Sequence, residues 1–325
     1  MSRPVAWGLR RAGRAGLAGV LALCVPLVAW AGEAFVTNQG SETVSIVDLE
    51  TLRVLAELPV AGKPAGVAVS PDQRLVYVTA PEGRAMTVVD AASRRLSHRL
   101  VVGSGPLGIA VNPASGEVYI ADWYEHRLVV VDPAGSGVLA AIDVGQSPSG
   151  LGVTPDGAYL LSADRDSNEV SVIELASRRK VAAVPVGERP FGLTLSADGR
   201  LALTANVGSN DVSVIDIGAR KVVATVAVGR RPYAIALAGG KAFVSDQYSA
   251  TVTVIDTSSW RVVRTIPVGD HPEGIAADAD GRHVYVACWF DNTLERIDVE
   301  TLTVTGKVKV GDGPRAFGDF LRRAP

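Results

Sequence analysis

Two sequence markers that recur seven times, with four short predicted strands in each interval, predict an all-β fold, a seven-bladed β-propeller. Prolines recur at intervals of 42, 42, 42, 42, 40 and 42 residues, at Pro64, Pro106, Pro148, Pro190, Pro232, Pro272 and Pro314. An acidic residue ends a β-branched run at the same intervals, at Asp48, Asp90, Asp132, Glu174, Asp216, Asp256 and Asp298. Because two independent markers keep one register, they indicate a structural repeat of 42 residues.

Each repeat is predicted to form four strands, taken here in the order in which they follow the proline. The first strand is exemplified by Gly66–Val69, and the turn Ser70–Gln73 leads to the second strand, Leu75–Thr79. The third and fourth strands are clearest at Val212–Asp216 and Val222–Val226. These β-branched runs are bounded by Gly, Pro, Asp or Asn, and none carries the 3.6-residue stripe of a helix.

The two ends of the repeat region complement one another. The repeats begin at Phe35 with what reads as the second strand of a blade, while Pro314–Phe320 matches a first strand. We therefore expect the C-terminal strand to pair into the N-terminal blade and close the ring, because an open ring leaves unpaired strand edges.

Residues 1–31 have the pattern of a secretory signal peptide, which leaves residues 32–325 as the propeller. Arg3, Arg10, Arg11 and Arg14 precede an apolar run at 17–28, and Ala29-Trp30-Ala31 fits a small-x-small cleavage site. No second apolar stretch is long enough to cross a bilayer. We expect cleavage after Ala31 and a periplasmic or secreted mature protein without a membrane span.

Composition and charge exclude several classes of protein. With 47% hydrophobic residues and a net charge of -2, the chain is not disordered. Removing residues 1–31 leaves 28 basic and 34 acidic side chains, a net charge of -6, which argues against a duplex DNA binder. Cys288 is the only cysteine beyond residue 31, so the mature chain has no internal disulfide.

The repeat motifs resemble those of a known family. Tyr77–Thr79, Phe35–Asn38 and Val212–Asp216 look like the motifs of YVTN-repeat β-propellers, and the similarity covers the whole chain after the predicted cleavage site. The resemblance implies an exported bacterial seven-bladed propeller. It implies no single function, because such propellers serve many.

Candidate binding residues lie in two sets of loops that share one face of a propeller, which we call the loop face. One set joins the fourth strand of a blade to the first strand of the next, and the other joins the second and third strands within a blade. Because function usually lies where loops vary on a regular scaffold, we take the repeat-variable residues as the candidate ligand-binding face. These residues are Lys63, Asp122, Trp123, Asp164, Arg189, Arg231, Tyr233, Asp246, His271, Glu273, Cys288, Trp289 and Arg315.

Each of these residues also has a purely structural interpretation. An Arg before a proline also suits an ion pair with a neighbouring blade, and an Asp after the second strand also suits a cap on loop backbone. His271 and Cys288 are weak candidates for a metal site, since a soft metal accepts such ligands, whereas a buried, inert thiol is the alternative for Cys288. Arg296 replaces an apolar residue of the other blades, and we expect Glu295 or an acid of a neighbouring blade to pair with it.

The function favoured by the sequence is an exported binding or scaffold protein, monomeric, whose partner is a protein or a small molecule. The chain has no Gly-x-Ser-x-Gly elbow, phosphate loop or Cys-x-x-Cys motif, which weighs against an enzyme. Three alternatives remain open. They are an accessory of periplasmic redox chemistry that binds a quinone, haem or metal, a lactonase-like hydrolase using His271, Glu273 and Arg231, and a single-stranded nucleic acid binder.

Overall fold

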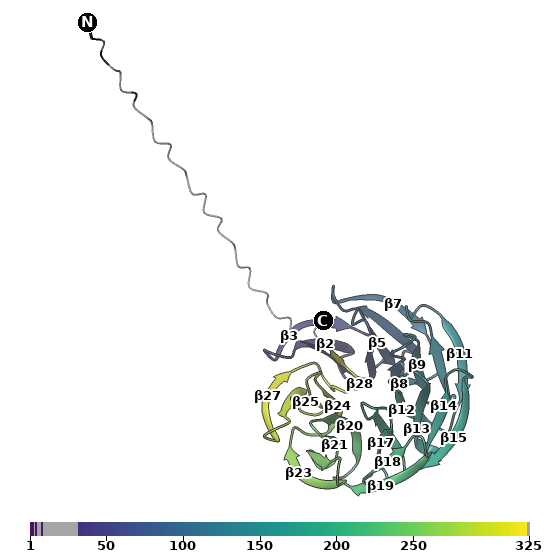
Figure 1. Ribbon diagram of the computed structural model, residues 1–325. Coiled ribbons are helices and arrows are strands. Elements are labelled where there is room, and N and C mark those ends of the chain that lie inside the picture. Colours follow the sequence, from purple (N-terminus) through teal and green to yellow (C-terminus); the bar gives the residue numbers. More distant parts are fainter. Residues whose placement is uncertain (3, 5–7, 9–31, 324–325) are drawn as a thin grey trace. The chain divides into compact units, whose positions relative to one another are not determined.

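The computed structural model describes residues 1, 2, 4, 8 and 32–323. The chain divides into two units, Met1–Trp30 and Ala31–Pro325, and the sheets described below belong to the second. Apart from residues 1, 2, 4 and 8, the predicted signal peptide lies outside the described residues, and so does Ala29-Trp30-Ala31 at its predicted cleavage site. The second unit is a ring of seven antiparallel sheets (Figure 1), which confirms the predicted seven-bladed propeller.

The first three blades follow the predicted repeat. The first blade has the strand order β29 (Leu321–Arg322), β1 (Glu33–Asn38), β2 (Thr43–Asp48) and β3 (Arg53–Pro59). The second blade contains β4 (Gly66–Val69), β5 (Leu75–Ala80), β6 (Ala85–Asp90) and β7 (Arg95–Val101). The third blade contains β8 (Pro106–Val111), β9 (Val118–Asp122), β10 (Arg127–Val131) and β11 (Val138–Asp143).

The remaining four blades repeat the same order. The fourth contains β12 (Pro148–Val153), β13 (Tyr159–Asp164), β14 (Glu169–Glu174) and β15 (Arg179–Pro185), with the 3₁₀ turn η1 (Arg165–Ser167) between β13 and β14. The fifth contains β16 (Pro190–Leu195), β17 (Leu201–Asn206), β18 (Asp211–Asp216) and β19 (Lys221–Ala227). The sixth and seventh contain β20 (Pro232–Ala238), β21 (Lys241–Asp246), β22 (Thr251–Asp256), β23 (Arg261–Pro267), β24 (Pro272–Ala277), β25 (His283–Cys288), β26 (Thr293–Asp298) and β27 (Thr303–Lys309).

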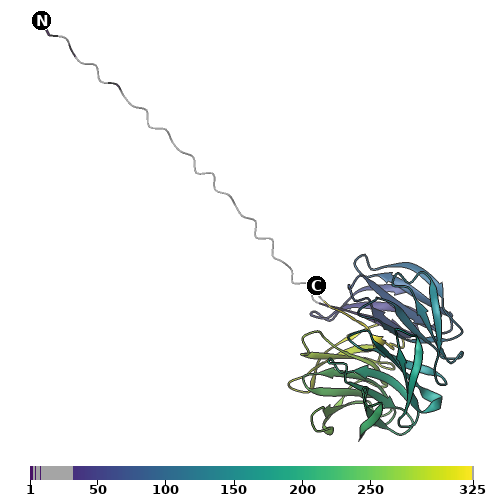
Figure 2. The same ribbon diagram turned by 45° about the vertical axis from the view of Figure 1, so that its right-hand side comes forward.

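Burial follows the position of each strand within its blade. Second and third strands such as β5 and β6 are buried along almost their whole length, because neighbouring sheets pack on both of their faces. Outer strands such as β7 are exposed. The core therefore lies between successive blades, and Figure 2 shows these blades from a second direction.

Glycine on the inner strands allows these strands to converge on the ring axis. A Cβ atom on Gly108 would collide with the carbonyl oxygen of Ser149 in the next blade, and one on Gly274 would collide with that of Ala316. Backbone approaches this close leave no room for a side chain. The small residue two positions after each proline is therefore a scaffold feature.

The C-terminal segment contacts both the first and the second blade. β29 pairs antiparallel with β1, through Glu33 opposite Arg322 and Ala34 opposite Leu321. A further short strand, β28 (Phe317–Asp319), pairs parallel with β4 and makes the second sheet five-stranded, a pairing that the repeat pattern did not predict. Figure 1 shows β3, near the start of the ring, beside β27, near its end.

Arg296 has different partners from those expected. Its Nη1 donates to the backbone carbonyl of Leu49 at 3.4 Å and its Nε donates to the hydroxyl of Thr305 at 3.2 Å. The expected carboxylate of Glu295 accepts instead from the backbone of Gly269 at 3.3 Å. A carbonyl of the first blade thus takes the place of the predicted acid.

None of the described segments forms a helix long and apolar enough to cross a membrane.

Candidate functional site

Backbone hydrogen bonds join the two loop sets of the loop face in pairs. In most blades, the N–H of the residue after the second strand donates to the carbonyl of the residue before the proline that recurs in each repeat. The donor and acceptor pairs are Trp123 and Gly105 at 2.9 Å, Val207 and Arg189 at 3.0 Å, Gln247 and Arg231 at 3.0 Å, and Trp289 and His271 at 3.0 Å. Variable residues far apart in the sequence therefore lie side by side on this face.

The residue before the proline takes a left-handed backbone conformation in several blades. φ is 54° at Arg189 and 56° at Arg231, although neither is glycine. A side-chain amide oxygen holds each N–H: Asn168 Oδ1 lies 2.8 Å from the nitrogen of Arg189, and Asn210 Oδ1 lies 2.7 Å from that of Arg231. These caps fix the direction in which the two arginine side chains leave the loop.

A cavity of about 240 Å³ opens on this face, and we call it the axial pocket. Residues of both loop sets and of the inner-strand starts line it: Trp123, Arg165, Phe191, Val207, Arg231, Tyr233, Gln247 and Arg315. Four of these residues, Trp123, Arg231, Tyr233 and Arg315, were predicted as binding residues. The pocket combines aromatic walls with a few polar groups, as small-molecule sites do.

Aromatic rings form one side of the axial pocket. Phe191 packs against Tyr233 with ring centroids 4.7 Å apart, and against Trp123 at 6.2 Å. Behind them, Phe317 lies 5.0 Å from Phe191 and 5.5 Å from Tyr233. Phe191, Tyr233 and Phe317 come from strands β16, β20 and β28, and Trp123 from the loop after β9, so segments far apart in the sequence form this apolar side.

A buried polar network adjoins these rings at Tyr233. Arg315 Nε lies 3.0 Å from Glu273 Oε2 and donates to the hydroxyl of Tyr233 at 2.7 Å. Gln247 Nε2 donates to the other oxygen of Glu273 at 2.6 Å. Burial raises the pKa of Glu273 and the charge of Arg315 opposes that change, while Glu273 and Tyr233 raise the pKa of Arg315 against the effect of its own burial. Glu273 thus acts behind the pocket wall, as the partner of two lining residues.

The three predicted aspartates are buried, and Asp122 and Asp164 hold loop backbone. Asp122 accepts from the N–H of Gly105 at 2.9 Å, and Asp164 accepts from that of Gly145 at 2.9 Å. Asp246 accepts from the hydroxyl of Thr253 at 2.6 Å. All three are fully buried, and none lines the axial pocket.

Two of these buried carboxyl groups should make stability depend on pH. Burial, partly offset by hydroxyl and amide donors, raises the pKa of Asp164 to about 6 and that of Asp246 to about 6. A folded-state pKa above the unfolded value stabilises the protein at low pH, and this contribution is lost as the pH rises through about 6. We expect the wild type to lose on the order of 2 kcal/mol per group between pH 4 and pH 8.

Denaturant unfolding of wild type and Asp164→Asn at both pH values measures this effect. Asparagine already occupies the corresponding position at Asn38 and Asn206, where each amide contacts a third-strand serine. The substitution should flatten the pH dependence. An equal slope in the two proteins would show that Asp164 is ionised in the folded state throughout.

Cys288 occupies the position of these aspartates in the seventh blade, and its surroundings explain the exchange. The thiol is fully buried, and burial raises its pKa. Glu295, on the adjacent strand, accepts from the N–H of Gly269, where other blades use the end-of-strand aspartate. The cap has thus moved to a longer side chain on β26, and the small thiol leaves room for it.

His271 has a separate environment from Cys288. Its Nδ1 lies 2.8 Å from Asp270 Oδ1, and its ring meets Phe290 at 4.3 Å and Tyr248 at 5.2 Å. No side-chain contact joins it to Cys288 among the residues that the structure describes. A metal site formed by these two residues stays a prediction.

The other predicted residues do not line the axial pocket. Lys63 lies 3.8 Å from Glu42, and Arg189 is exposed. Trp289 lies behind Arg315, whose guanidinium is 5.6 Å from its ring. The predicted residues therefore fall into three groups: residues that line the pocket, residues of the loop face outside it, and residues that hold the loops in place.

Four lining residues were not among the candidates: Arg165, Phe191, Val207 and Gln247. All four occupy the same repeat positions as predicted ones, directly after the proline or after the second strand. The sequence also distinguishes Phe317, which packs behind the pocket, because the other blades have an aliphatic residue at its repeat position.

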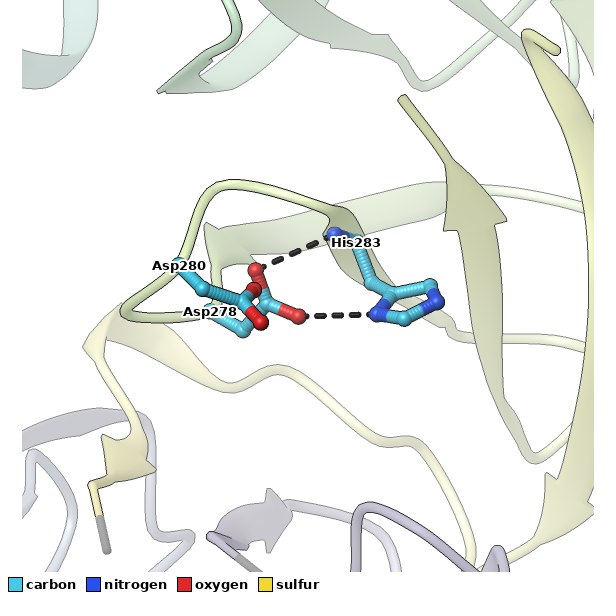
Figure 3. A group of neighbouring side chains, drawn as sticks. All are labelled: Asp278, Asp280 and His283. Carbon is cyan, nitrogen blue, oxygen red and sulfur yellow. Dashed lines mark hydrogen bonds and ion pairs between the residues drawn. The ribbon is translucent and has the colours of Figure 1, made fainter. Parts of the chain in front are cut away.

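A cluster of possible metal ligands lies at the turn between β24 and β25. Asp278, Asp280 and His283 approach one another there (Figure 3), and Asp278 Oδ2 lies 2.8 Å from His283 Nδ1. The same turn in other blades pairs a hydroxyl with an aspartate, as in Ser196 and Asp198 at 2.6 Å. The cluster is a variant of this repeated turn, since Asp278 also accepts from the N–H of His283 at 3.0 Å.

Comparisons with known proteins agree with the fold. A family model described as YNCE-like beta-propeller matches residues 22–115, and an NHL repeat model matches residues 104–131. No curated protein matches the sequence.

Solved structures with the same fold share little sequence with this chain. Hydrazine synthase of Kuenenia stuttgartiensis superposes with a TM-score of 0.72 and 21% identity, over 78% of this chain and 89% of that one. A functionally unknown protein from Desulfotomaculum acetoxidans gives a TM-score of 0.75 and 15% identity, over 89% and 100%. Dihydro-heme d1 dehydrogenase NirN in complex with DHE gives 0.68 and 18%, over 90% and 75%.

The matched repeat models and the ring of seven blades together fit the predicted resemblance to YVTN-type seven-bladed β-propellers.

Proposed function

We propose that this protein is an exported binding protein whose ligand or partner group enters the axial pocket. The observation that carries the proposal is the composition of this pocket. Three arginines and one amide surround an aromatic wall on a face where the remaining blades supply scaffold. We propose the monomer as the binding unit, a proposal supported by a pocket whose lining residues all come from one chain.

Binding is favoured over catalysis by the residues around the axial pocket. Its eight lining residues include no histidine, cysteine, serine or carboxylate to serve as nucleophile or general base. Glu273 lies behind the wall and is held by Arg315 and Gln247, and His271 is paired with Asp270. A lactonase-like base is therefore not supported.

A role beside redox chemistry is the second candidate. Two structural neighbours carry names of redox-related proteins, hydrazine synthase and a dihydro-heme d1 dehydrogenase, the latter in complex with DHE. An absorption spectrum of the protein recovered from its host separates this candidate from binding of a colourless ligand.

The proposed export rests on the signal-peptide pattern of residues 1–31. Strand β1 begins at Glu33, so cleavage after Ala31 leaves every blade intact. N-terminal sequencing of the protein from the periplasmic fraction should begin at Gly32, and a sequence that begins at Met1 would contradict export by this route.

The test of pocket binding fills the pocket. Val207→Phe places an aromatic ring among the lining residues, where it takes up part of the pocket. Val223→Phe makes the same change on the outer strand β19, where the side chain of Val223 is 47% exposed. We expect native mass spectrometry of protein recovered from the host to show a bound species on the wild type and on Val223→Phe. Val207→Phe should lack it. Equal occupancy in all three proteins would exclude the axial pocket as the site.

A further inference from the structure

The charge of the axial pocket is set by three guanidinium groups that differ in their partners. Arg315 is paired with Glu273 at 3.0 Å, and Arg165 Nη1 lies 2.8 Å from Asp166 Oδ1. Arg231 has no carboxylate within 4.0 Å among the residues that the structure describes. With two of three positive charges matched, the pocket retains a net charge of one.

Arg231 is also positioned to use that charge. Its nitrogen is held by Asn210 at 2.7 Å, its carbonyl accepts from Gln247 at 3.0 Å, and its guanidinium lies 4.9 Å from the ring centroid of Tyr248. A cation over an aromatic face keeps its edge N–H groups available for a ligand. A guanidinium binds a carboxylate through two parallel hydrogen bonds, with charge on both partners.

The size and walls of the axial pocket restrict the rest of a ligand whose carboxylate binds Arg231. Its volume of about 240 Å³ exceeds the roughly 150 Å³ that holds benzene in an engineered cavity. It therefore accepts one ring with a substituent. Trp123 and Phe191 offer ring faces and edges on one side of the pocket, so a planar apolar group packs there.

We infer that the axial pocket binds a single-ring aromatic carboxylate, with the carboxylate on Arg231 and the ring against Trp123 and Phe191. This inference rests on the proposed function and names the ligand class of the same site. The single unmatched charge favours a monoanion, so inorganic phosphate, which carries more charge and has no ring, binds less well.

The chain supplies a matched control for this test. Arg189 occupies the same repeat position as Arg231, with the same left-handed backbone and the same asparagine cap, but it does not line the pocket. Isothermal titration with benzoate, benzamide and inorganic phosphate therefore compares wild type, Arg231→Gln and Arg189→Gln. We expect Arg231→Gln to weaken benzoate binding by about tenfold or more, the loss of a charged hydrogen-bonded pair.

Arg189→Gln should leave benzoate affinity unchanged, and benzamide, which is neutral, should bind the wild type about as weakly as benzoate binds Arg231→Gln. Equal losses in both variants would show attraction by the whole face and overturn the inference, as would stronger binding of phosphate than of benzoate. If no benzoate binds, but Val207→Phe loses the species found on the wild type, the ligand class fails and the proposed function stands. If Val207→Phe binds benzoate as the wild type does, benzoate binds outside the axial pocket and the ligand class fails, and the proposed function fails as well only if Val207→Phe also keeps the species found on the wild type.

Discussion

Deletion of residues 313–325 should remove cooperative folding or lower the melting temperature sharply. The deleted segment supplies β28 and β29 and the buried side chains of Phe317, Phe320 and Leu321. Burial of each such side chain contributes about 1.5–3 kcal/mol, so the loss approaches the 5–15 kcal/mol that stabilises a typical domain. The deletion also exposes the edge of β1, whose Phe35 N–H donates to Phe320 at 2.8 Å.

Thermal unfolding followed by circular dichroism measures this effect, and Phe320→Ala is the milder companion. The ring of Phe320 is fully buried, so its truncation should cost about 3–5 kcal/mol. Val304→Ala, on the exposed strand β27, is the control and should change stability little. A melting temperature unaffected by the deletion would contradict the role of the C-terminal segment in holding the ring closed.

Glu33→Ala should cost about 3–5 kcal/mol of unfolding free energy, the range for breaking a buried ion pair. Glu33 is 1% exposed, with Oε1 2.6 Å from Arg94 Nη2 and Oε2 2.9 Å from Arg322 Nη1. One carboxylate thus links β1 to the turn after β6 and to β29, three segments that meet where the ring closes. Removing it takes the carboxylate partner from two arginines.

Guanidinium unfolding of Glu33→Ala and Glu42→Ala provides the comparison. Glu42 is exposed and lies 3.8 Å from Lys63, so its removal should cost less than about 1 kcal/mol. Similar costs for the two variants would mean that the buried network does not hold the closure together.

The repeat predicted the fold because two markers recur in one register, and each marker has a local physical cause. The proline starts an inner strand that lacks one N–H, and the acid after the third strand accepts turn N–H groups, as Asp298 does from Thr301 at 2.7 Å. Such local causes repeat with the sequence. The parallel pairing of β28 with β4 has no counterpart in the repeat, so the pattern did not contain it.

The loop face could be predicted, but the pocket on it could not. Lys63, Arg189 and Arg231 precede equivalent prolines, yet only Arg231 lines the axial pocket. The pocket also depends on the large side chains that follow two neighbouring prolines, Phe191 and Tyr233, which pack together in it. That information is spread over repeats far apart in the chain.

The seventh blade shows the same limit for a single residue. Cys288 was singled out from the sequence because it replaces an aspartate of the other blades. The structure explains this exchange by the longer Glu295 on the neighbouring strand, which holds the N–H of Gly269 instead. Only the pairing of β25 with β26 reveals that these two changes belong together.

A crystal of the protein soaked with 4-bromobenzoate tests the central claim most directly, through the anomalous signal of bromine. The binding account predicts one strong peak in the axial pocket, beside Trp123 and Phe191, with the carboxylate against Arg231. A peak only elsewhere, or an empty pocket in a crystal whose loop face is open to solvent, would contradict it.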